Sequence, residues 1–222
     1  MKNKYLKNGR ILDTQFRVIL REFCYDSSAT ETALRTDHNR KTINRLFNLF
    51  RKRILMLTEA ENGFDGEVEV DESYFGAKRI RGKRGRGAGG KIPVVGLLKR
   101  GGNVYTQIVN NCSKKELMPV IKGKVLELSD VYTDGWKSYD GLVLNGYKHY
   151  RIHHSEDEFA DGKKHINGIE SFWSYAKRRM RKHNGIHKHK FILHLKESEF
   201  RWNNRGGKMY KRLLKEFRLN PL

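Results

Sequence analysis

The feature that most limits the fold of this 222-residue chain is a change in the spacing of its apolar residues near Glu61-Asn62-Gly63. Before this turn-like break, apolar side chains recur every three or four residues, which is the spacing of an amphipathic helix. After the break, short alternating or continuous apolar stretches bounded by glycine are typical of strands. We therefore expect a small helical region over residues 1–62 and an α/β domain over residues 63–222.

Five segments of the second region have the pattern of strands. The first, residues 67–75, is expected to be half-buried, because Val68, Val70 and Tyr74 alternate with polar side chains. Arg100-Gly-Gly-Asn103 is a plausible hairpin turn between the second and third strands. The segments predict a sheet that begins with a three-strand meander. The four later strands are predicted at residues 91–98, 104–109, 131–134 and 147–152.

Helices are predicted between and after these strands. Ser113 and Glu116 form a capping-box pattern that opens one helix, although Pro119 requires this helix to start later or to kink. Two long helices, residues 166–182 and 190–203, finish the chain. This order of elements resembles a ribonuclease-H-like fold, an α/β sheet with helices on its faces.

The chain carries a large excess of positive charge. It has 46 Lys and Arg against 25 Asp and Glu, a formal net charge of +21. Self-repulsion of this size opposes a compact state unless a polyanion neutralises it, so nucleic acid is the expected partner. An anionic membrane surface is a second possibility, and a purely structural basic protein is a third.

Several classes of protein do not fit the sequence. No run of 18 apolar residues predicts a membrane-spanning helix, and no apolar run follows the N-terminal lysines as in a signal peptide. Cys24 and Cys112 stand far apart, without the Cys-x-x-Cys pattern of a zinc ribbon. We therefore expect a cytoplasmic protein associated with the nucleoid, without a membrane or small-molecule partner.

The first region contains three predicted helices. Apolar residues from Phe16 to Phe23 fall at positions i, i+3, i+4 and i+7. Ser28 and Glu31 form a capping box for a short second helix. A turn at residues 36–39 then leads into a third helix, whose apolar face extends from Ile43 to Leu57.

The opposite face of the third helix is basic and polar. A short helix, a tight turn and a basic helix resemble the helix-turn-helix of DNA-binding proteins. An ordinary helical bundle with a solvated charged face is the alternative. The residues expected to contact DNA are Arg40, Lys41, Asn44, Arg45 and Asn48.

Two further segments concentrate positive charge. Lys78–Lys91 contains seven Lys or Arg and no acid, and we expect it to form a DNA clamp or a solvated loop. From Ser171 to Lys196 there are eight Lys or Arg and four His, again without an acid. The candidate DNA contacts in these segments are Lys78, Arg79, Arg81, Lys83, Arg84, Arg86, Lys177, Arg178, Arg179, Arg181 and Lys182.

Three acidic residues stand out by their positions. Asp71 ends or interrupts the first predicted strand, Asp134 ends the fourth, and Glu170 lies near the start of a predicted helix. Carboxylates from neighbouring strand ends and a facing helix can converge on Mg²⁺ or Mn²⁺, which prefer oxygen ligands. Lys177 lies two helical turns after Glu170 and therefore on the same face, where it can contact a phosphate.

Four stretches, in the same order along the chain, carry a resemblance to a known family. They are Val70–Gly76, Tyr132–Trp136, His165–Arg178 and Glu199–Arg205. The chain resembles the insertion-sequence transposases of the DDE superfamily, in the ISXO-like branch that shares its catalytic core with Merlin-type elements. The resemblance extends over roughly residues 67–205 and implies a transposase.

The family resemblance implies a specific chemistry. Asp71, Asp134 and Glu170 would hold two Mg²⁺ or Mn²⁺ ions per active site for the cleavage and joining of double-stranded DNA. The substrates would be the inverted-repeat ends of an insertion sequence and a target DNA, bound by at least a homodimer. A nuclease or resolvase of the same fold, and a helix-turn-helix regulator with an inactive core, are the alternatives.

The sequence departs from its relatives in two ways. Several longer relatives begin with a zinc ribbon, and this chain has no cysteines for one. We therefore expect DNA-end recognition to depend on the helices between Phe16 and Leu57 or on the core. Some relatives use an asparagine as the third residue, and Asn167 lies one turn before Glu170. We favour Glu170, since a carboxylate binds Mg²⁺ more strongly than an amide, and expect Asn167 to orient a ligand or a metal-bound water.

Overall fold

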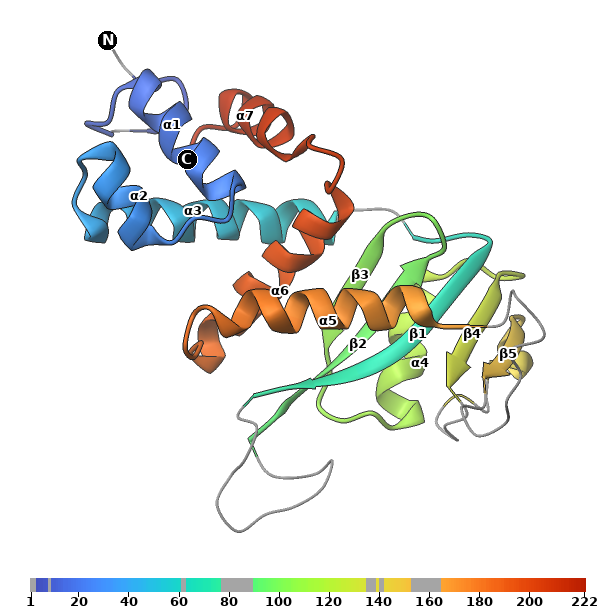
Figure 1. Cartoon of the computed structure of the whole chain (residues 1–222). Coiled ribbons are helices and arrows are strands. Elements are labelled where there is room, and N and C mark those ends of the chain that lie inside the picture. Colours follow the sequence, from blue (N-terminus) through green and yellow to red (C-terminus); the bar gives the residue numbers. More distant parts are fainter. Residues whose placement is uncertain are drawn as a thin grey trace. The chain divides into compact units, whose positions relative to one another are not determined.

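The computed structural model describes residues 3–7, 9–60, 63–76, 90–134, 139, 142–152 and 165–222 (Figure 1). Its internal contacts divide the chain into two compact units. The helical unit comprises Met1–Leu57 together with Asn204–Leu222, and the sheet unit comprises Thr58–Asn203. The predicted division at residue 62 placed residues 204–222 in the α/β domain, whereas they belong to the helical unit. None of the described helices is both long and apolar enough to cross a membrane.

The helical unit contains the three predicted helices and a fourth. They are α1 (Asp13–Cys24), α2 (Ala29–Thr36), α3 (Arg40–Glu59, of which the last two residues belong to the sheet unit) and α7 (Met209–Leu219). The predicted capping box of α2 is confirmed, since the Ser28 Oγ accepts from the Glu31 backbone N–H at 3.2 Å. No helix was predicted at the position of α7.

Aromatic rings fill the core of the helical unit. The ring centroids of Phe16 and Phe50 lie 5.6 Å apart, and Phe217 of α7 lies 5.9 Å from Phe16 and 5.2 Å from Phe50. Met209, Leu213 and Phe217 are buried at positions i, i+4 and i+8 of α7. Burial of this apolar stripe holds the end of the chain against α1.

The sheet unit is built on five strands. They are β1 (Glu67–Phe75), β2 (Ile92–Lys99), β3 (Val104–Ile108), β4 (Asp130–Asp134) and β5 (Lys148–Ile152). The strand order is β3-β2-β1-β4-β5. β1, β2 and β3 pair antiparallel, whereas β4 is parallel to both β1 and β5. An antiparallel meander continued by parallel strands is the predicted ribonuclease-H-like arrangement, which is confirmed.

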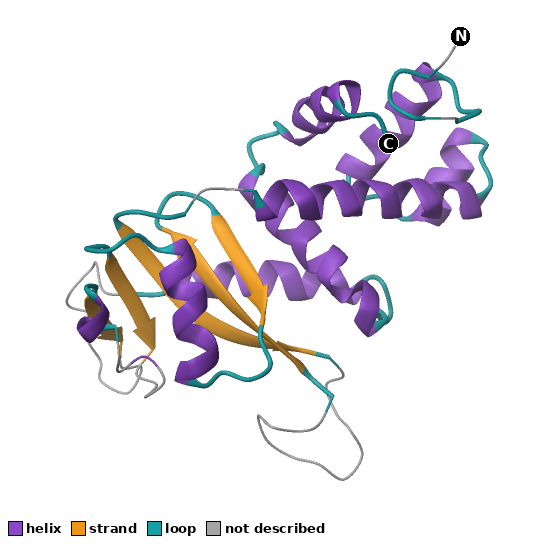
Figure 2. Cartoon of the chain, turned by 180° about the vertical axis from the view of Figure 1, so that it is seen from behind, coloured by secondary structure: helices purple, strands orange, loops and turns teal. Residues whose placement is uncertain are grey.

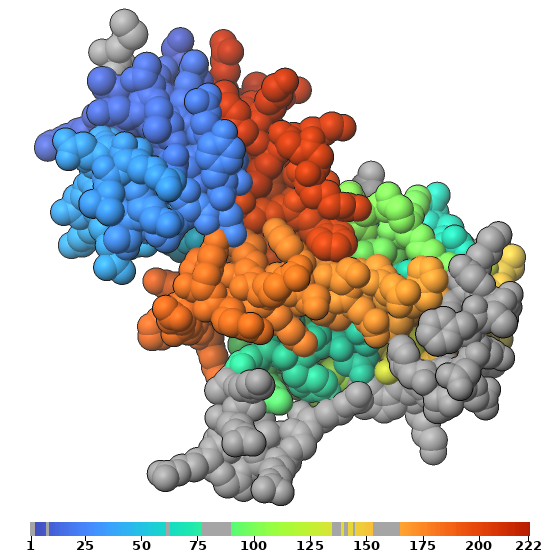
Figure 3. Space-filling model, in the orientation of Figure 1, coloured from blue at the N-terminus to red at the C-terminus, as the bar shows by residue number. Residues whose placement is uncertain are grey.

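Helices cover both faces of this sheet (Figure 2). α4 (Lys114–Lys124) packs on one face, where its residues share a core with Val68 and Val70. α5 (Asn167–Arg181) and α6 (Lys188–Asn203) pack on the other. Figure 3 shows α5 running across β1 on this side. β1 is therefore buried on both faces, and the expectation of a half-buried strand is wrong.

The start of α4 also differs from the expectation. Its N-cap residue, Ser113, makes no side-chain capping hydrogen bond, so the predicted capping box does not form. The Glu116 carboxylate instead accepts from the backbone and side-chain amides of Asn110, at 3.2 and 3.1 Å. The helix begins at Lys114 and contains Pro119, so a later start is not needed.

Candidate active site

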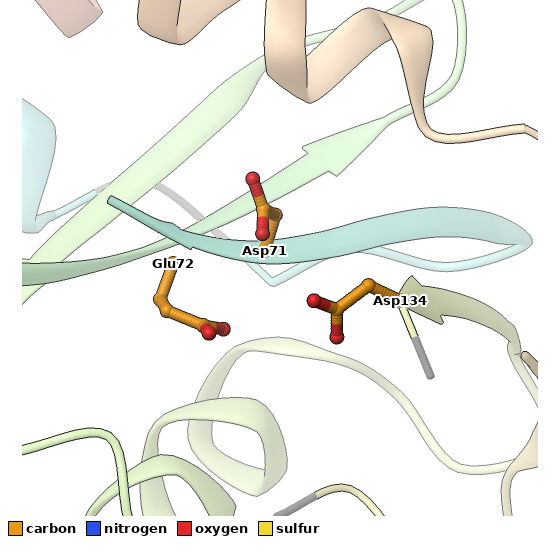
Figure 4. Close-up of side chains that lie close together, drawn as sticks. All are labelled: Asp71, Glu72 and Asp134. Atoms are coloured by element: carbon orange, nitrogen blue, oxygen red, sulfur yellow. The ribbon is translucent and has the colours of Figure 1, made fainter. Parts of the chain in front are cut away.

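Parallel pairing of β1 and β4 brings two acids together. Val70 pairs with Thr133, and each is followed directly by an aspartate, Asp71 or Asp134. Carboxylate oxygens of Asp71, Asp134 and Glu72 all lie within 4.8 Å of one another, a group that could hold a metal ion (Figure 4). The two strands thus join acids that stand far apart in the sequence.

Glu72 is the member of this group that the sequence analysis missed. In Figure 4 its side chain leaves β1 on the side opposite to Asp71, as alternation along a strand requires. The Tyr139 hydroxyl donates to Glu72 Oε2 at 2.6 Å. Burial, together with the charge of Glu72, raises the pKa of Tyr139 well above its ordinary value, so the hydroxyl keeps the proton it donates. The acidic pair Asp71-Glu72 was the only sequence signal for this residue.

α5 contributes the third predicted acid. A pocket in the sheet unit is lined by Asp71, Asp134, Glu170 and Lys177, with Trp173 between the two α5 residues. Glu170 lies outside the tight group of three carboxylates. Its charge nevertheless raises the pKa of Asp71. The pocket therefore unites the three acids and the lysine that the sequence analysis selected.

The acidity of Asp71 is perturbed by its surroundings. The pKa of Asp71 is raised to about 6, chiefly by burial. The neighbouring charges of Asp134 and Glu170 also raise it, and hydrogen bonds lower it. One of these bonds comes from Trp173, whose Nε1 donates to Asp71 Oδ2 at 3.0 Å. A group of carboxylates that repel one another in this way favours a cation, and its oxygen ligands fit Mg²⁺ or Mn²⁺.

Lys177 and Asn167 have different positions relative to this pocket. The Lys177 Nζ lies 5.6 Å from the centroid of the Phe75 ring, and burial lowers the pKa of Lys177 while the charge of Asp71 raises it. Lys177 thus shares the face of α5 that carries Glu170, as expected. Asn167 is exposed at the first turn of α5 and does not belong to the described lining of the pocket.

Comparisons with known proteins identify the family. The model of the ISXO2-like transposase domain matches residues 63–203. The chain belongs to this transposase family. The match covers nearly the whole sheet unit, including the acidic pocket, and confirms the resemblance inferred from the four sequence stretches.

Two relatives that are similar in sequence agree with this assignment. An uncharacterized transposase-like protein of Haemophilus influenzae is 46% identical over 113 residues, which are 51% of this chain and 91% of that protein. An uncharacterized protein in the transposable element ISH50 of Halobacterium salinarum is 30% identical over 153 residues, 62% of this chain and 52% of that protein. The crystal structure of the Mos1 strand transfer complex aligns with 96% of this chain and 81% of its own, with 11% identity and a TM-score of 0.30.

The candidate DNA contacts of this family member divide into three groups. On α3, four of the five are exposed and Asn48 is half-buried. On and after α5, the exposed ones are Lys177, Arg178, Arg181 and Lys182. The third group lies outside the described residues: Lys78, Arg79, Arg81, Lys83, Arg84 and Arg86.

Arg179 requires a correction. It is 5% exposed and forms an ion pair with Glu197 of α6, while its Nη1 donates to Ser198 Oγ at 3.2 Å. Arg179 lies on the apolar side of α5, with Phe172 and Met180, rather than on the basic side. A buried, paired guanidinium is not available to a phosphate, so the prediction that Arg179 contacts DNA is wrong.

Proposed function

We propose that the chain is a metal-dependent transposase that cleaves and joins DNA at the inverted-repeat ends of an insertion sequence. The observation that carries this proposal is the pocket that Asp71 and Asp134 of adjacent strands share with Glu170 and Lys177 of α5. The pocket lies within the part of the chain that matches the transposase family. Its acids stand in a chain with a formal net charge of +21, which suits a polyanionic substrate.

Asp71, Asp134 and Glu170 would hold Mg²⁺ or Mn²⁺, two ions per site. Such ions activate the attacking oxygen and stabilise the leaving oxygen of a phosphoryl transfer. The protein's own groups set the geometry. Trp173 holds the Asp71 carboxylate by a hydrogen bond, and Tyr139 does the same for Glu72, which adds a carboxylate to the site.

Lys177 would bind the phosphate of the cut DNA end. It lines the pocket from the same helix face as Glu170, and its ammonium group adds positive charge beside three carboxylates. Water as the nucleophile would give strand cleavage, and a DNA 3′-hydroxyl would give strand joining. Joining two element ends requires two active sites, so we propose that at least a homodimer acts on DNA.

The helical unit would recognise the element ends. α2 (Ala29–Thr36) and α3 are separated by the three residues 37–39, which is the length of a helix-turn-helix turn. Asp37 at the end of α2 adopts a left-handed conformation with φ of 49°, which makes the turn tight. The exposed basic side of α3 would then face the DNA, and its phosphate contacts would make affinity depend strongly on salt.

A strand-transfer assay tests the proposal. Labelled element-end DNA, a plasmid target and Mg²⁺ are incubated with the wild type or with Asp134→Asn, which has nearly the same shape but lacks the charge. We expect joined products from the wild type alone. Cleavage without joining would identify a nuclease or resolvase, and DNA binding without either reaction, even with Mn²⁺, would support a regulator with an inactive core.

A further inference from the structure

A buried carboxylate outside the pocket connects β1 to α5. Glu69 lies two residues before Asp71 on β1, so both side chains leave the strand on the side of α5. Only 1% of Glu69 is exposed. A carboxylate in such a place is costly unless hydrogen bonds and an opposite charge compensate it, so its partners indicate what it does.

The first partner of Glu69 is the start of α5. The first backbone N–H groups of a helix have no partner within the helix, and the N-cap residue of α5, Ile166, has no polar side chain to supply one. Glu69 Oε2 accepts from the backbone N–H of Ile169 at 2.8 Å. A carboxylate from β1 therefore caps α5 one residue before Glu170.

Gly168 permits this close approach. A Cβ atom on Gly168 would lie 2.8 Å from Glu69 Oε2 and 3.0 Å from Leu98 Cδ2. A side chain at position 168 would therefore require the Glu69 carboxylate to shift and Leu98 to give way slightly, or α5 to move away from the sheet. The distance between the start of α5 and β1 thus depends on a glycine and a carboxylate together.

Arg100 completes the arrangement. Its Nε donates to Glu69 Oε1 at 3.2 Å, and its Nη2 donates to the backbone carbonyl of His165 at 2.6 Å. The guanidinium carbon lies 3.7 Å from the centroid of the Tyr132 ring. Arg100 thereby compensates the buried charge of Glu69 and fixes the backbone of His165, the residue before the N-cap of α5, so the start of the helix is held at two points.

We propose that Glu69 is a positioning residue for the acidic pocket. It holds the first turn of α5 against the strand that carries Asp71, so that Glu170 stands over the pocket. This inference rests on the proposed function, since it assigns to Glu69 the placement of a metal-binding carboxylate. Glu69 itself does not bind the metal ion.

The test measures Mn²⁺ affinity of the full chain by calorimetry. Glu69→Ala removes the cap, and Gly168→Ala crowds the Glu69 carboxylate at the start of α5 without removing a charge. We expect each to weaken Mn²⁺ binding by about tenfold or more, the usual effect of losing a group that orients a metal ligand. Glu69→Gln should recover most of the affinity, because its amide oxygen can still accept from Ile169. The matched control is Glu67→Gln. The Glu67 carboxylate accepts from Arg100 and Tyr132, and its replacement should change Mn²⁺ affinity less than twofold.

A double-mutant cycle separates positioning from general damage. If Glu69 acts through Glu170, adding Glu69→Ala to Glu170→Gln should weaken Mn²⁺ binding no further, whereas independent effects would add. Hydrogen exchange at the Ile169 amide should accelerate in Glu69→Ala. Additive losses of affinity in the cycle would overturn the inference and leave the proposed function intact. The same holds if Glu170→Gln weakens Mn²⁺ binding but neither Glu69→Ala nor Gly168→Ala does. A wild type that binds no Mn²⁺ would overturn both.

Discussion

Different interactions stabilise the interior of the helical unit and the interior of the sheet unit. Rings of Phe16, Phe50 and Phe217 pack against one another in the helical unit. In the part of the chain that the structure describes, the buried charged side chains all belong to the sheet unit. They are Glu69, Arg179, Lys196, Glu197, Glu199 and Arg201.

Each buried acid of the sheet unit has a cationic partner. Arg100 pairs with Glu69, Arg179 and Arg201 pair with Glu197, and Lys196 pairs with Glu199. Apolar cores tolerate repacking that keeps their volume, whereas a buried ion pair compensates its loss of hydration only in good geometry. We infer that the difference matches the tasks of the two units: one must hold acids in fixed positions, and the other must present a surface to DNA.

Removal of a pocket acid should have the largest effect. We expect Asp71→Asn to lower the rates of cleavage and joining by about 10³-fold or more, because a metal ligand supports several kcal/mol of transition-state stabilisation. DNA affinity, which we assign mainly to the helical unit, should stay within a few fold in a filter-binding assay. Asp65→Asn, an exposed acid of the sheet unit, is the control and should keep full activity.

Breaking a fully buried ion pair should cost more stability than breaking a partly exposed one. Glu197→Ala leaves Arg179 and Arg201 buried without their partner, which should lower the free energy of unfolding by about 3–5 kcal/mol. Glu216→Ala in the helical unit breaks a 2.7 Å pair with Arg53 that is partly exposed, and should cost about 1 kcal/mol. Urea denaturation measures both, and equal losses would remove the contrast between the units.

The pocket should respond to pH through Asp71. The pKa of Asp71 is about 6 in the folded chain, so below pH 6 this carboxyl is mostly protonated and Mn²⁺ must displace the proton. Apparent Mn²⁺ affinity should therefore fall about tenfold per pH unit below 6 and level off above. Without metal, the folded state binds the proton more tightly than the unfolded state. Stability should therefore decrease as pH rises from about 3.8 to about 6.

Trp173→Phe sharpens the assignment of this pH response. It removes the hydrogen bond that lowers the pKa of Asp71, so the midpoint of the Mn²⁺ affinity profile should move to higher pH. Calorimetric titrations from pH 5 to pH 8 measure the midpoint. A profile that is the same in Trp173→Phe and the wild type would assign the titration to another group.

The smallest effect is expected on the basic surface of the helical unit. Arg45→Ala should weaken DNA binding and reduce the slope of log affinity against log salt by about 0.9, the loss of one phosphate contact. Strand transfer at saturating DNA should not change. The control within the same unit is Arg21→Ala on α1. The Arg21 guanidinium carbon lies 5.3 Å from the centroid of the Tyr210 ring, and its removal should leave the slope unchanged.

Local patterns in the sequence predicted most of the elements and the pocket acids. The spacing of Phe16 to Phe23 depends only on helix geometry and predicted α1, and the helix predicted at residues 166–182 agrees with α5 to within one residue at each end. Asp71 and Asp134 were selected because strands end near them, and parallel pairing then brings them together.

What the sequence analysis missed depends on partners far along the chain. Arg179 is one more arginine in a basic stretch until Glu197 of α6 is placed beside it. Glu69 alternates with valines as a surface residue would, and its burial follows from the packing of Arg100 and of the start of α5 against it. The apolar spacing of α7 was present in Met209, Leu213 and Phe217, but the pattern does not tell which unit buries it.

Iron-directed cleavage of the protein would test most directly whether the three acids share a metal site. Fe²⁺ replaces Mg²⁺ at oxygen-ligand sites, and with ascorbate and peroxide it cuts the nearby backbone; mass spectrometry then locates the cuts. We predict cuts close to Asp71, Asp134 and Glu170, suppressed by excess Mg²⁺ and absent in Asp134→Asn. Cuts confined to other segments, such as the histidines of residues 183–194, or cuts that Mg²⁺ does not suppress, would contradict a metal site at these acids.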